Sequence, residues 1–312
     1  MSETDWDILG IGNSAVDELI YLNQFPQPDE KVEVCDVQRQ GGGLVATALV
    51  AAARQGTKTA FCSLIGSDEL SVFTLEELKK ENVDCSPCVY SEHGVPFHAW
   101  VFVDKKDHTR TILYKTGVVE PPLEAINEAL ISRCKILFID HHVPLAGLKA
   151  AKIAKDLGIQ VVADLETNRI PGFDELLNLI DHLIISANFA HQLTGKQDVE
   201  DAVRQLSGSS RAGCVVTAGE QGSWYSEFGG DVNHYPAFSV DVVDTTGCGD
   251  VFHGVYVAEL VKGKSIIEAI TFATAAAAIK ATSPGGRIGI PNTEQINTFL
   301  SSRYYEDDLG KD

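Results

Sequence analysis

The fold is decided by the stretch Val242-Val243-Asp244-Thr245-Thr246-Gly247-Cys248-Gly249-Asp250-Val251-Phe252. An apolar strand end runs here into Gly-x-Gly, and apolar residues at 251, 252, 255 and 258 predict a helix directly after it. The first N–H groups of a helix lack partners within the helix and lie at the positive end of its dipole. The turn therefore favours an anion, and Asp250 lies beside it in the first helical turn. A carboxylate at this position is also explained as a mere helix cap.

Outside this stretch, helical and short apolar segments alternate between residues 121 and 217. Helices are predicted over 121–132, 144–157, 173–180 and 198–207, and strands over 136–139, 160–163, 182–185 and 214–217. A further buried strand is predicted at 8–11. This alternation is typical of an α/β fold around a parallel sheet, which binds ligands beyond the carboxyl ends of its strands.

Two other regions predict a small antiparallel sheet. Residues 31–37 and 96–103 alternate imperfectly, and 109–114 follows the second of them across a charged turn, Asp104-Lys105-Lys106-Asp107. We therefore expect a single domain over 1–312, with a lid formed by segments near 13–38 and 96–117. Such a lid would lie over the ligand-binding edge of the α/β body.

Composition and charge exclude several classes of function. The chain has 25 Lys+Arg against 44 Asp+Glu, a formal net charge of −19, which makes nucleic acid an unlikely partner. No stretch of about 18 apolar residues is present, and the N-terminus lacks the basic flank and apolar run of a signal peptide. Seven scattered cysteines are typical of reduced thiols. We expect a cytoplasmic protein that does not bind membranes.

Three minor motifs leave alternatives open. Asp140-His141-His142 at a strand end is compatible with a metal site, with the lining of a substrate pocket or with a structural role. Adjacent histidines on an extended chain point to opposite faces, which disfavours the metal. Cys85-x-x-Cys88 has no second pair and is more simply a pair of loop cysteines. The thiol of Cys248 is either activated by the helix N-terminus or packed beneath the turn and inert.

The full motif at residues 244–250 resembles a signature of the PfkB (ribokinase-like) family of carbohydrate kinases, Asp-Thr-x-Gly-Ala-Gly-Asp, with Cys248 where alanine is usual. A second family signature resembles Gly41-Gly42-Gly43-Leu44-Val45-Ala46-Thr47-Ala48, and the early Gly-x-x-x-x-Asp resembles residues 12–17. Within the family, the motifs are most similar to those of sulfofructose kinases and ketohexokinases. The resemblance implies a ribokinase-like three-layer sandwich with a mostly parallel central sheet and a small β-sheet lid.

The resemblance implies ATP-dependent transfer of the γ-phosphate to a hydroxyl of a small, ketose-like sugar. Asp250 would be the general base, and the amides of Gly247, Cys248 and Gly249 would hold the charge of the transferred group. A nucleoside kinase of the same family is an alternative. A catalytically weak sugar- or nucleotide-binding regulator is another, although the intact Asp250 favours an enzyme.

The resemblance also implies the residues that bind the ligands. Those for the substrate are Asp17, Lys31, Gly42, Gly43, Thr47 and His142. Those for the nucleotide are Asn188, Thr217, Gly219, Gly222 and Gly286, while Asp244 and Thr246 would bind a monovalent cation. The implied cofactors are ATP, Mg²⁺ and K⁺, and the implied assembly is a homodimer through the lid sheet. His142 and Tyr114 stand where sulfofructose kinases have arginine and asparagine, which favours a neutral or differently substituted ketose.

Overall fold

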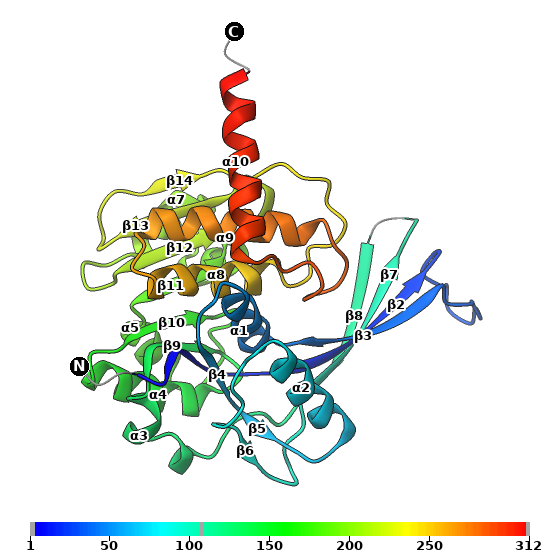
Figure 1. Ribbon diagram of the computed structural model, residues 1–312, viewed down its shortest axis with the longest axis horizontal. Coiled ribbons are helices and arrows are strands. Elements are labelled where there is room, and N and C mark those ends of the chain that lie inside the picture. Colours follow the sequence, from blue (N-terminus) through cyan, green and yellow to red (C-terminus); the bar gives the residue numbers. More distant parts are fainter. Residues whose placement is uncertain (1–3, 107–108, 310–312) are drawn as a thin grey trace.

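The computed structural model describes residues 4–106 and 109–309, and only the backbone of 304–309. Asp107 of the predicted charged turn and the two ends of the predicted domain therefore lie outside the described residues. The body is a three-layer α/β sandwich around an eight-stranded sheet, in the order β14-β13-β12-β11-β10-β9-β1-β4 (Figure 1). Its strands are β1 (Trp6–Ile11), β4 (Thr59–Cys62), β9 (Cys134–Asp140), β10 (Gln160–Asp164), β11 (His182–Ser186), β12 (Gly213–Thr217), β13 (Ser223–Glu227) and β14 (Asn233–Tyr235). All pairs from β12 to β4 are parallel, whereas β13 and β14 are antiparallel.

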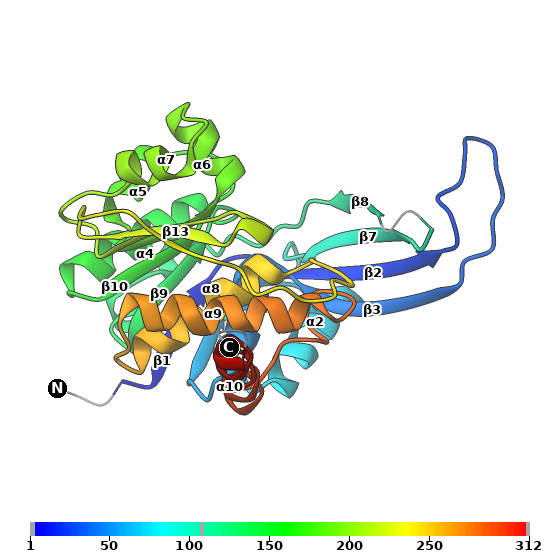
Figure 2. The same ribbon diagram turned by 90° about the horizontal axis from the view of Figure 1, so that it is seen from above.

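Helices cover both faces of this sheet (Figure 2). The chain's α-helices are α1 (Leu44–Arg54), α2 (Glu69–Lys80), α3 (Glu128–Ile131), α4 (Pro144–Asp156), α5 (Phe173–Leu179), α6 (Ala187–Thr194), α7 (Val199–Leu206), α8 (Cys248–Val261), α9 (Ile266–Ala281) and α10 (Thr293–Leu309). Strand residues alternate between two apolar cores because successive side chains point to opposite faces. Ile8 and Ile136 pack with α1, α8 and α9, whereas Leu9 and Leu137 pack with α4 to α7.

A second sheet of four strands projects from the body, in the order β3-β2-β7-β8 (Figure 1). Its strands are β2 (Ala15–Leu22), β3 (Asp36–Gly42), β7 (Phe97–Asp104) and β8 (Thr109–Lys115). The loop 23–35 between β2 and β3 extends beyond the far end of this small sheet (Figure 2). A separate pair, β5 (Leu64–Ile65) and β6 (Val89–Tyr90), completes the strands.

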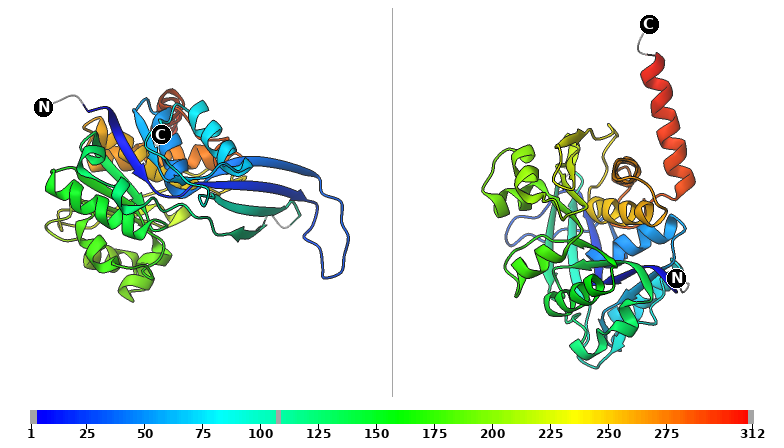
Figure 3. Two further views of the ribbon diagram at one scale, coloured as in Figure 1. Left: turned by 90° about the horizontal axis from the view of Figure 1, so that it is seen from below. Right: turned by 90° about the vertical axis from the view of Figure 1, so that its left-hand side faces the viewer.

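The C-terminal helix α10 packs against the body only through its first half (Figure 3). Ile296 and Leu300 join the core that contains α9. In the described part of the chain, no helix is both long enough and apolar enough to cross a membrane.

Several predicted elements are confirmed and others are wrong. The strands predicted at 136–139, 160–163, 182–185 and 214–217 correspond to β9, β10, β11 and β12. The strand predicted over 31–37 is wrong, because β3 begins only at Asp36 and extends through Gly42 to pair with β2. The helix predicted over 121–132 is reduced to a 3₁₀ turn (Leu123–Ala125) and the short α3. Helix α6, directly after β11, was not predicted.

Candidate active site

Functional side chains gather where the parallel strands of the body end. Asp140 ends β9, Asp164 ends β10 and Thr217 ends β12. Because these strands are parallel and adjacent or nearly so, their carboxyl ends meet at one edge. Helix α8 begins at this edge, since its buried residues pack on β1, β9 and β10.

The glycine turn before α8 is shaped for close backbone approach. Gly247 has φ 73°, and a Cβ at this position would come within 2.8 Å of the Gly286 carbonyl oxygen. The next residue, Cys248, begins α8, and apart from its chain neighbours and the helix's own backbone, Gly249 has no described atom within 4 Å of the position that a Cβ would take. The turn therefore presents the helix N-terminus without side chains that would hold a phosphate away.

Asp250 lies in the first turn of α8, in acidic surroundings. Burial raises the pKa of Asp250 well above its ordinary value, and the negative charge of Asp164 raises it further. Glu166 and Asp17 contribute in the same direction, so these carboxylates lie near Asp250. A carboxylate with a raised pKa is a stronger proton acceptor once it is ionised, as a general base requires.

His253, one helical turn after Asp250, lies beside these carboxylates. Its Nδ1 contacts the Gly249 carbonyl oxygen (2.8 Å) and its Nε2 the Ile184 carbonyl oxygen (3.0 Å). These two contacts hold the ring between the first turn of α8 and strand β11. Nδ1 also lies 3.5 Å from the Asp164 carboxylate. Sequence reasoning missed His253, although its spacing of three from Asp250 puts both on one helix face.

The small sheet brings Asp17 to this edge. Asp17 lies on β2, opposite Gln40 of β3. Its carboxylate packs so closely against Gly42 that a Cβ on residue 42 would overlap the carboxylate. Gly43 has φ 93°, which only glycine adopts easily, and the following amide of Leu44 is capped by Asn13 (2.8 Å). Burial raises the pKa of Asp17 to about 6.

Arg287, which sequence reasoning missed, lies fully inside the site. Its side chain donates to the Thr47 hydroxyl (3.2 Å) and to the Gly42 carbonyl oxygen (2.8 Å). Its Nη1 has no partner among the residues that the structure describes. Burial lowers the pKa of Arg287 to about 10, which leaves it charged at neutral pH. Thr47, predicted to bind substrate, therefore also positions this guanidinium.

Two predicted substrate residues have different environments. Burial lowers the pKa of His142 to about 4, so the ring is neutral, and it lies 4.6 Å from the ring of Phe97. Its backbone N–H donates to Asp140 (2.9 Å). Lys31 lies in the exposed loop 23–35, and the structure does not bring it to the carboxyl edge of the body.

The predicted nucleotide residues follow neighbouring strands. Ser186, the last residue of β11, pairs in register with Thr217, the last residue of β12. Asn188 is exposed in the first turn of α6, immediately after β11. Gly219 begins a 3₁₀ turn after β12 and Gly222 follows that turn, and both have positive φ (58° and 88°). These residues thus share one edge with Asp250.

Arg110 connects the small sheet to the segment before the glycine turn. From β8 its guanidinium donates to the Asp244 carboxylate (2.7 Å), to the Thr245 hydroxyl (3.1 Å) and to the Thr246 hydroxyl. These are the residues for which a monovalent cation is predicted. The pairing spans 134 residues of sequence, and no local pattern indicated it.

The cysteine motifs are packed inside the protein. Within the described ranges, no group of three or more His, Cys, Asp and Glu side chains could hold a metal ion. Cys85 and Cys88 are buried free thiols. Burial raises the pKa of Cys248, and its Sγ lies 3.6 Å from the Ala277 carbonyl oxygen of α9, which favours the packed, inert alternative.

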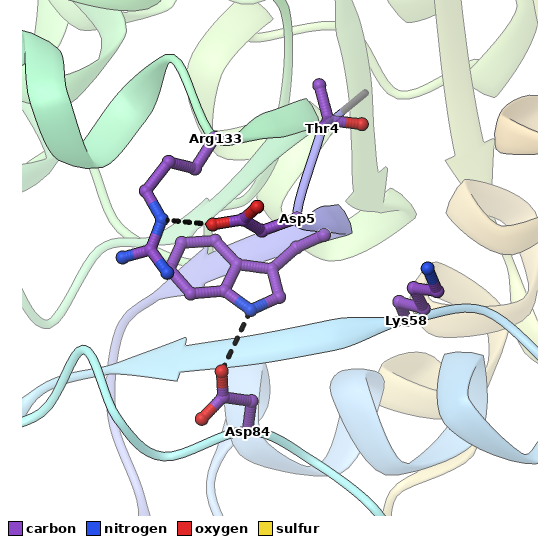
Figure 4. A pocket seen from close by; sticks show the side chains of 6 residues that line it. Thr4, Asp5, Lys58, Asp84 and Arg133 are labelled. Carbon is purple, nitrogen blue, oxygen red and sulfur yellow. Dashed lines mark hydrogen bonds and ion pairs between the residues drawn. The ribbon is translucent and has the colours of Figure 1, made fainter. Parts of the chain in front are cut away.

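A surface pocket beside Trp6 lies at the opposite edge of the sheet (Figure 4). Arg133 covers the Trp6 ring at 3.9 Å and pairs with Asp5 at 2.6 Å, while the indole donates to Asp84 at 2.9 Å. Trp6 begins β1, so this pocket is at the amino ends of the strands, far from the edge that carries Asp250.

Comparison with known proteins agrees with this geometry. Residues 11–293 match the pfkB family carbohydrate kinases. The chain belongs to this family. It is 32% identical over 299 residues to the ribokinase of Haemophilus influenzae, covering 93% of this chain and 97% of that protein. This kinase is therefore an enzyme that phosphorylates carbohydrates.

A further relative of the kinase is also named for a pentose. A deoxyribokinase of Salmonella typhi is 28% identical over 312 residues, covering 95% of this chain and 99% of that protein. The solved structure of a putative ribokinase from Agrobacterium tumefaciens superposes with a TM-score of 0.89 at 24% identity, over 96% of this chain and 99% of that one. The ribokinase-like fold is thus confirmed. The expected closer likeness to sulfofructose kinases and ketohexokinases finds no support in these names.

Proposed function

We propose that this carbohydrate kinase transfers the γ-phosphate of ATP to a hydroxyl of a free pentose, ribose or deoxyribose. The observation that carries the proposal is the juxtaposition of Asp250 and the bare glycine turn with Asp17 of the small sheet. In this proposal Asp250 accepts a proton, the glycine turn binds an anion and Asp17 binds sugar hydroxyls. Phosphoryl transfer needs little more than this positioning and charge stabilisation.

In the proposed reaction, Asp17 accepts hydrogen bonds from sugar hydroxyls and holds one hydroxyl between Asp250 and the glycine turn. Asp250 takes the hydroxyl proton while the sugar oxygen forms a bond to the γ-phosphorus. The bond from this phosphorus to the bridging oxygen breaks, and ADP leaves. The amides of Gly247, Cys248 and Gly249 stabilise the charge on the transferred group.

The residues proposed to bind the nucleotide agree with this chemistry. Helix α8 offers unpaired N–H groups, and the turn around Gly219 and Gly222 offers further backbone close to Thr217. Magnesium is commonly bound by substrate phosphates and only one or two carboxylates. Bound Mg²⁺ would neutralise phosphate charge, and the acidic residues around Asp250 are the groups available to it.

The substrate class follows from the surroundings of Asp17. A free pentose offers several hydroxyls, and the site offers Asp17 as an acceptor and the unpartnered Nη1 of Arg287 as a donor. His142 is neutral and Lys31 lies in an exposed loop, so neither adds a positive charge to that of Arg287 for binding a sulfonate or phosphate. The names of the relatives point to the same class. The ketose expected from the motifs is the alternative, since a probable fructokinase of Arabidopsis thaliana is also related, at 27% identity.

A coupled assay of ADP release tests the proposal. The panel consists of ribose, deoxyribose, fructose, fructose phosphates, sulfofructose and nucleosides. We expect the highest kcat/KM with ribose or deoxyribose. A preference for fructose or a nucleoside would replace the proposed substrate, and thermal stabilisation by ligands without turnover of any of them would favour the binding regulator.

We further propose that the small sheet acts as the lid of the site and pairs two copies of the chain in a homodimer. Asp17 and Arg110 both reach the site from this sheet. All residues of β8 are exposed, among them Ile112, Leu113 and Tyr114. The seven free cysteines support a cytoplasmic location.

A further inference from the structure

Lys280 is a fully buried cation in the last turn of α9. Its exposed fraction is 0%. Its ammonium donates to the carbonyl oxygens of Asp244 (2.8 Å) and Ser283 (3.4 Å), so its direct partners are backbone carbonyls. Burying an ammonium group is costly, and lysine is almost never fully buried without compensation. Its position therefore calls for a physical reason.

The surroundings favour a single positive charge at this point. The last carbonyl groups of a helix lack partners within the helix and form the negative end of its dipole, and Lys280 lies in that turn of α9. Burial lowers the pKa of Lys280, but Asp244 and Asp250 are among the neighbours that raise it. The local field thus supports a cation within reach of the catalytic turn.

The ammonium joins the two segments that hold the glycine turn. The amides of Val243 and Asp244 donate to the Ala281 carbonyl oxygen (2.8 and 3.1 Å), at the end of α9. The Asp244 carboxylate accepts from the amide of Gly285 (2.8 Å). Lys280 adds a bond from α9 to each segment, at Asp244 and at Ser283. Since Gly247 packs directly on Gly286, these bonds fix the base of the proposed anion site.

A monovalent cation does not fit the place predicted for it. One carboxylate oxygen of Asp244 accepts from Arg110 and Thr246, and the other accepts from Gly285. The carbonyl oxygen of Asp244 accepts from Lys280. An ion bound to these oxygens would have to displace their donors and would meet two positive charges. The expected role of Asp244 and Thr246 as K⁺ ligands is therefore not supported by the structure.

We propose that the Lys280 ammonium replaces the monovalent cation in this kinase, so that catalysis needs no potassium. The ammonium carries one positive charge and contacts carbonyl oxygens, as a bound K⁺ would, but it is covalently attached to α9. Its charge and its bonds hold residues 244–246 against 283–286 and keep the amides of the glycine turn in place. The activity readout below rests on the proposed function, whereas the stability readout does not.

The first test compares salts on the wild-type enzyme. Kinase activity and thermal denaturation are measured in tetramethylammonium chloride and in KCl at equal ionic strength. We expect kcat and the midpoint of denaturation to be the same in both salts. A stimulation of kcat by K⁺ of about tenfold or more, or a rise in the midpoint specific to K⁺, would overturn the proposal, because either requires an unfilled cation site.

The second test removes the charge. Lys280→Ala opens space for an ion, and Lys280→Met keeps most of the apolar stem. In tetramethylammonium chloride we expect Lys280→Ala to lose about 10²-fold in kcat, since small displacements of catalytic groups cost this much. Potassium or ammonium ions should restore much of that loss and raise the midpoint of denaturation. Lys280→Met should be restored less, because its side chain fills the space.

Lys264→Met is the matched control, because Lys264 is an exposed lysine just before the same helix, paired with Glu268. It should show no dependence on the cation. A Lys280→Ala variant that keeps wild-type activity and stability without K⁺ would refute the proposal. If no sugar is turned over, the proposed substrate fails while the denaturation midpoints still decide the role of Lys280. If the Lys280 variants do not fold, the wild-type comparison of salts decides it.

Discussion

Asp250 must be ionised to accept a proton, although burial and Asp164 raise its pKa. We therefore expect kcat/KM to fall as the pH is lowered through this raised pKa. Asp250→Asn should lower kcat by about 10²–10⁴-fold at neutral pH and still show thermal stabilisation by ATP. Asp241→Asn, which changes an exposed carboxylate of the preceding segment, is the control and should behave as wild type. An asparagine variant that retains more than about a tenth of kcat would falsify the assignment of the base.

Asp17 carries a cost in stability that depends on pH. Burial raises its pKa from 3.8 to about 6, so the folded chain binds a proton that the unfolded chain releases first. The stabilisation from this proton is present below pH 3.8 and is lost as the pH rises through about 6. Asp17→Asn removes the titration, and above that pH it should stabilise the unliganded protein by up to about 3 kcal/mol while abolishing sugar phosphorylation.

Urea denaturation of wild type and Asp17→Asn, at roughly pH 4 and pH 7.5, measures this effect. The variant's advantage in the free energy of unfolding should be larger at the higher pH. An advantage that is the same at both values would show that Asp17 is not held with a raised pKa.

Arg110 of strand β8 bonds to the segment before the glycine turn. Charged hydrogen bonds of this kind are each worth about 1.5–3 kcal/mol, so Arg110→Ala should lower kcat/KM by about tenfold or more. Exchange of backbone hydrogens in β7 and β8 should become faster at the same time, because the small sheet loses its tie to Asp244. Arg39→Ala is the matched control, since Arg39 ties β3 to Glu69 of α2 and does not contact the glycine turn. Equal kinetic losses in both variants would contradict a specific role of Arg110.

At the scale of elements, the sequence predicts what local chemistry determines. The strands β9 to β12 are recognisable because each is a short apolar run followed by a helical segment. The sequence placed strand β3 too early, because glycine has a low strand propensity and Gly41 and Gly42 therefore did not look like strand residues. In the structure both glycines pair with β2. The glycine turn and Asp250 were recognisable because they are contiguous in the sequence.

Contacts between distant segments were not predictable in this way. Lys280 lies 36 residues from Asp244, and Arg110 lies 134 residues from it. Their positions follow only once α9 and the small sheet have packed on the body. A lysine in an alanine-rich helix and an arginine in an exposed strand have no local feature that reveals an internal partner.

At the scale of the whole molecule, one face of the small sheet carries exposed apolar side chains on its two edge strands. Residues alternate across the sheet, so Asp17 and Arg110 share the face directed at the body, and the opposite face carries Trp100, Phe102 and Leu113. Val37, paired with Ile20, is 54% exposed, and Leu113, paired with Trp100, is 56% exposed. A second copy of this face would provide an apolar surface of matching kind.

We therefore expect a homodimer in solution, with a mass that light scattering after size exclusion resolves from that of a 33.7 kDa monomer. Leu113→Lys brings like charges to the paired faces and should shift the protein towards monomer. Leu145→Lys changes a leucine of α4 that is 46% exposed and should leave the mass unchanged. If the wild type is monomeric at all concentrations, the apolar face has no such partner. If both variants stay dimeric, the interface lies elsewhere on the chain.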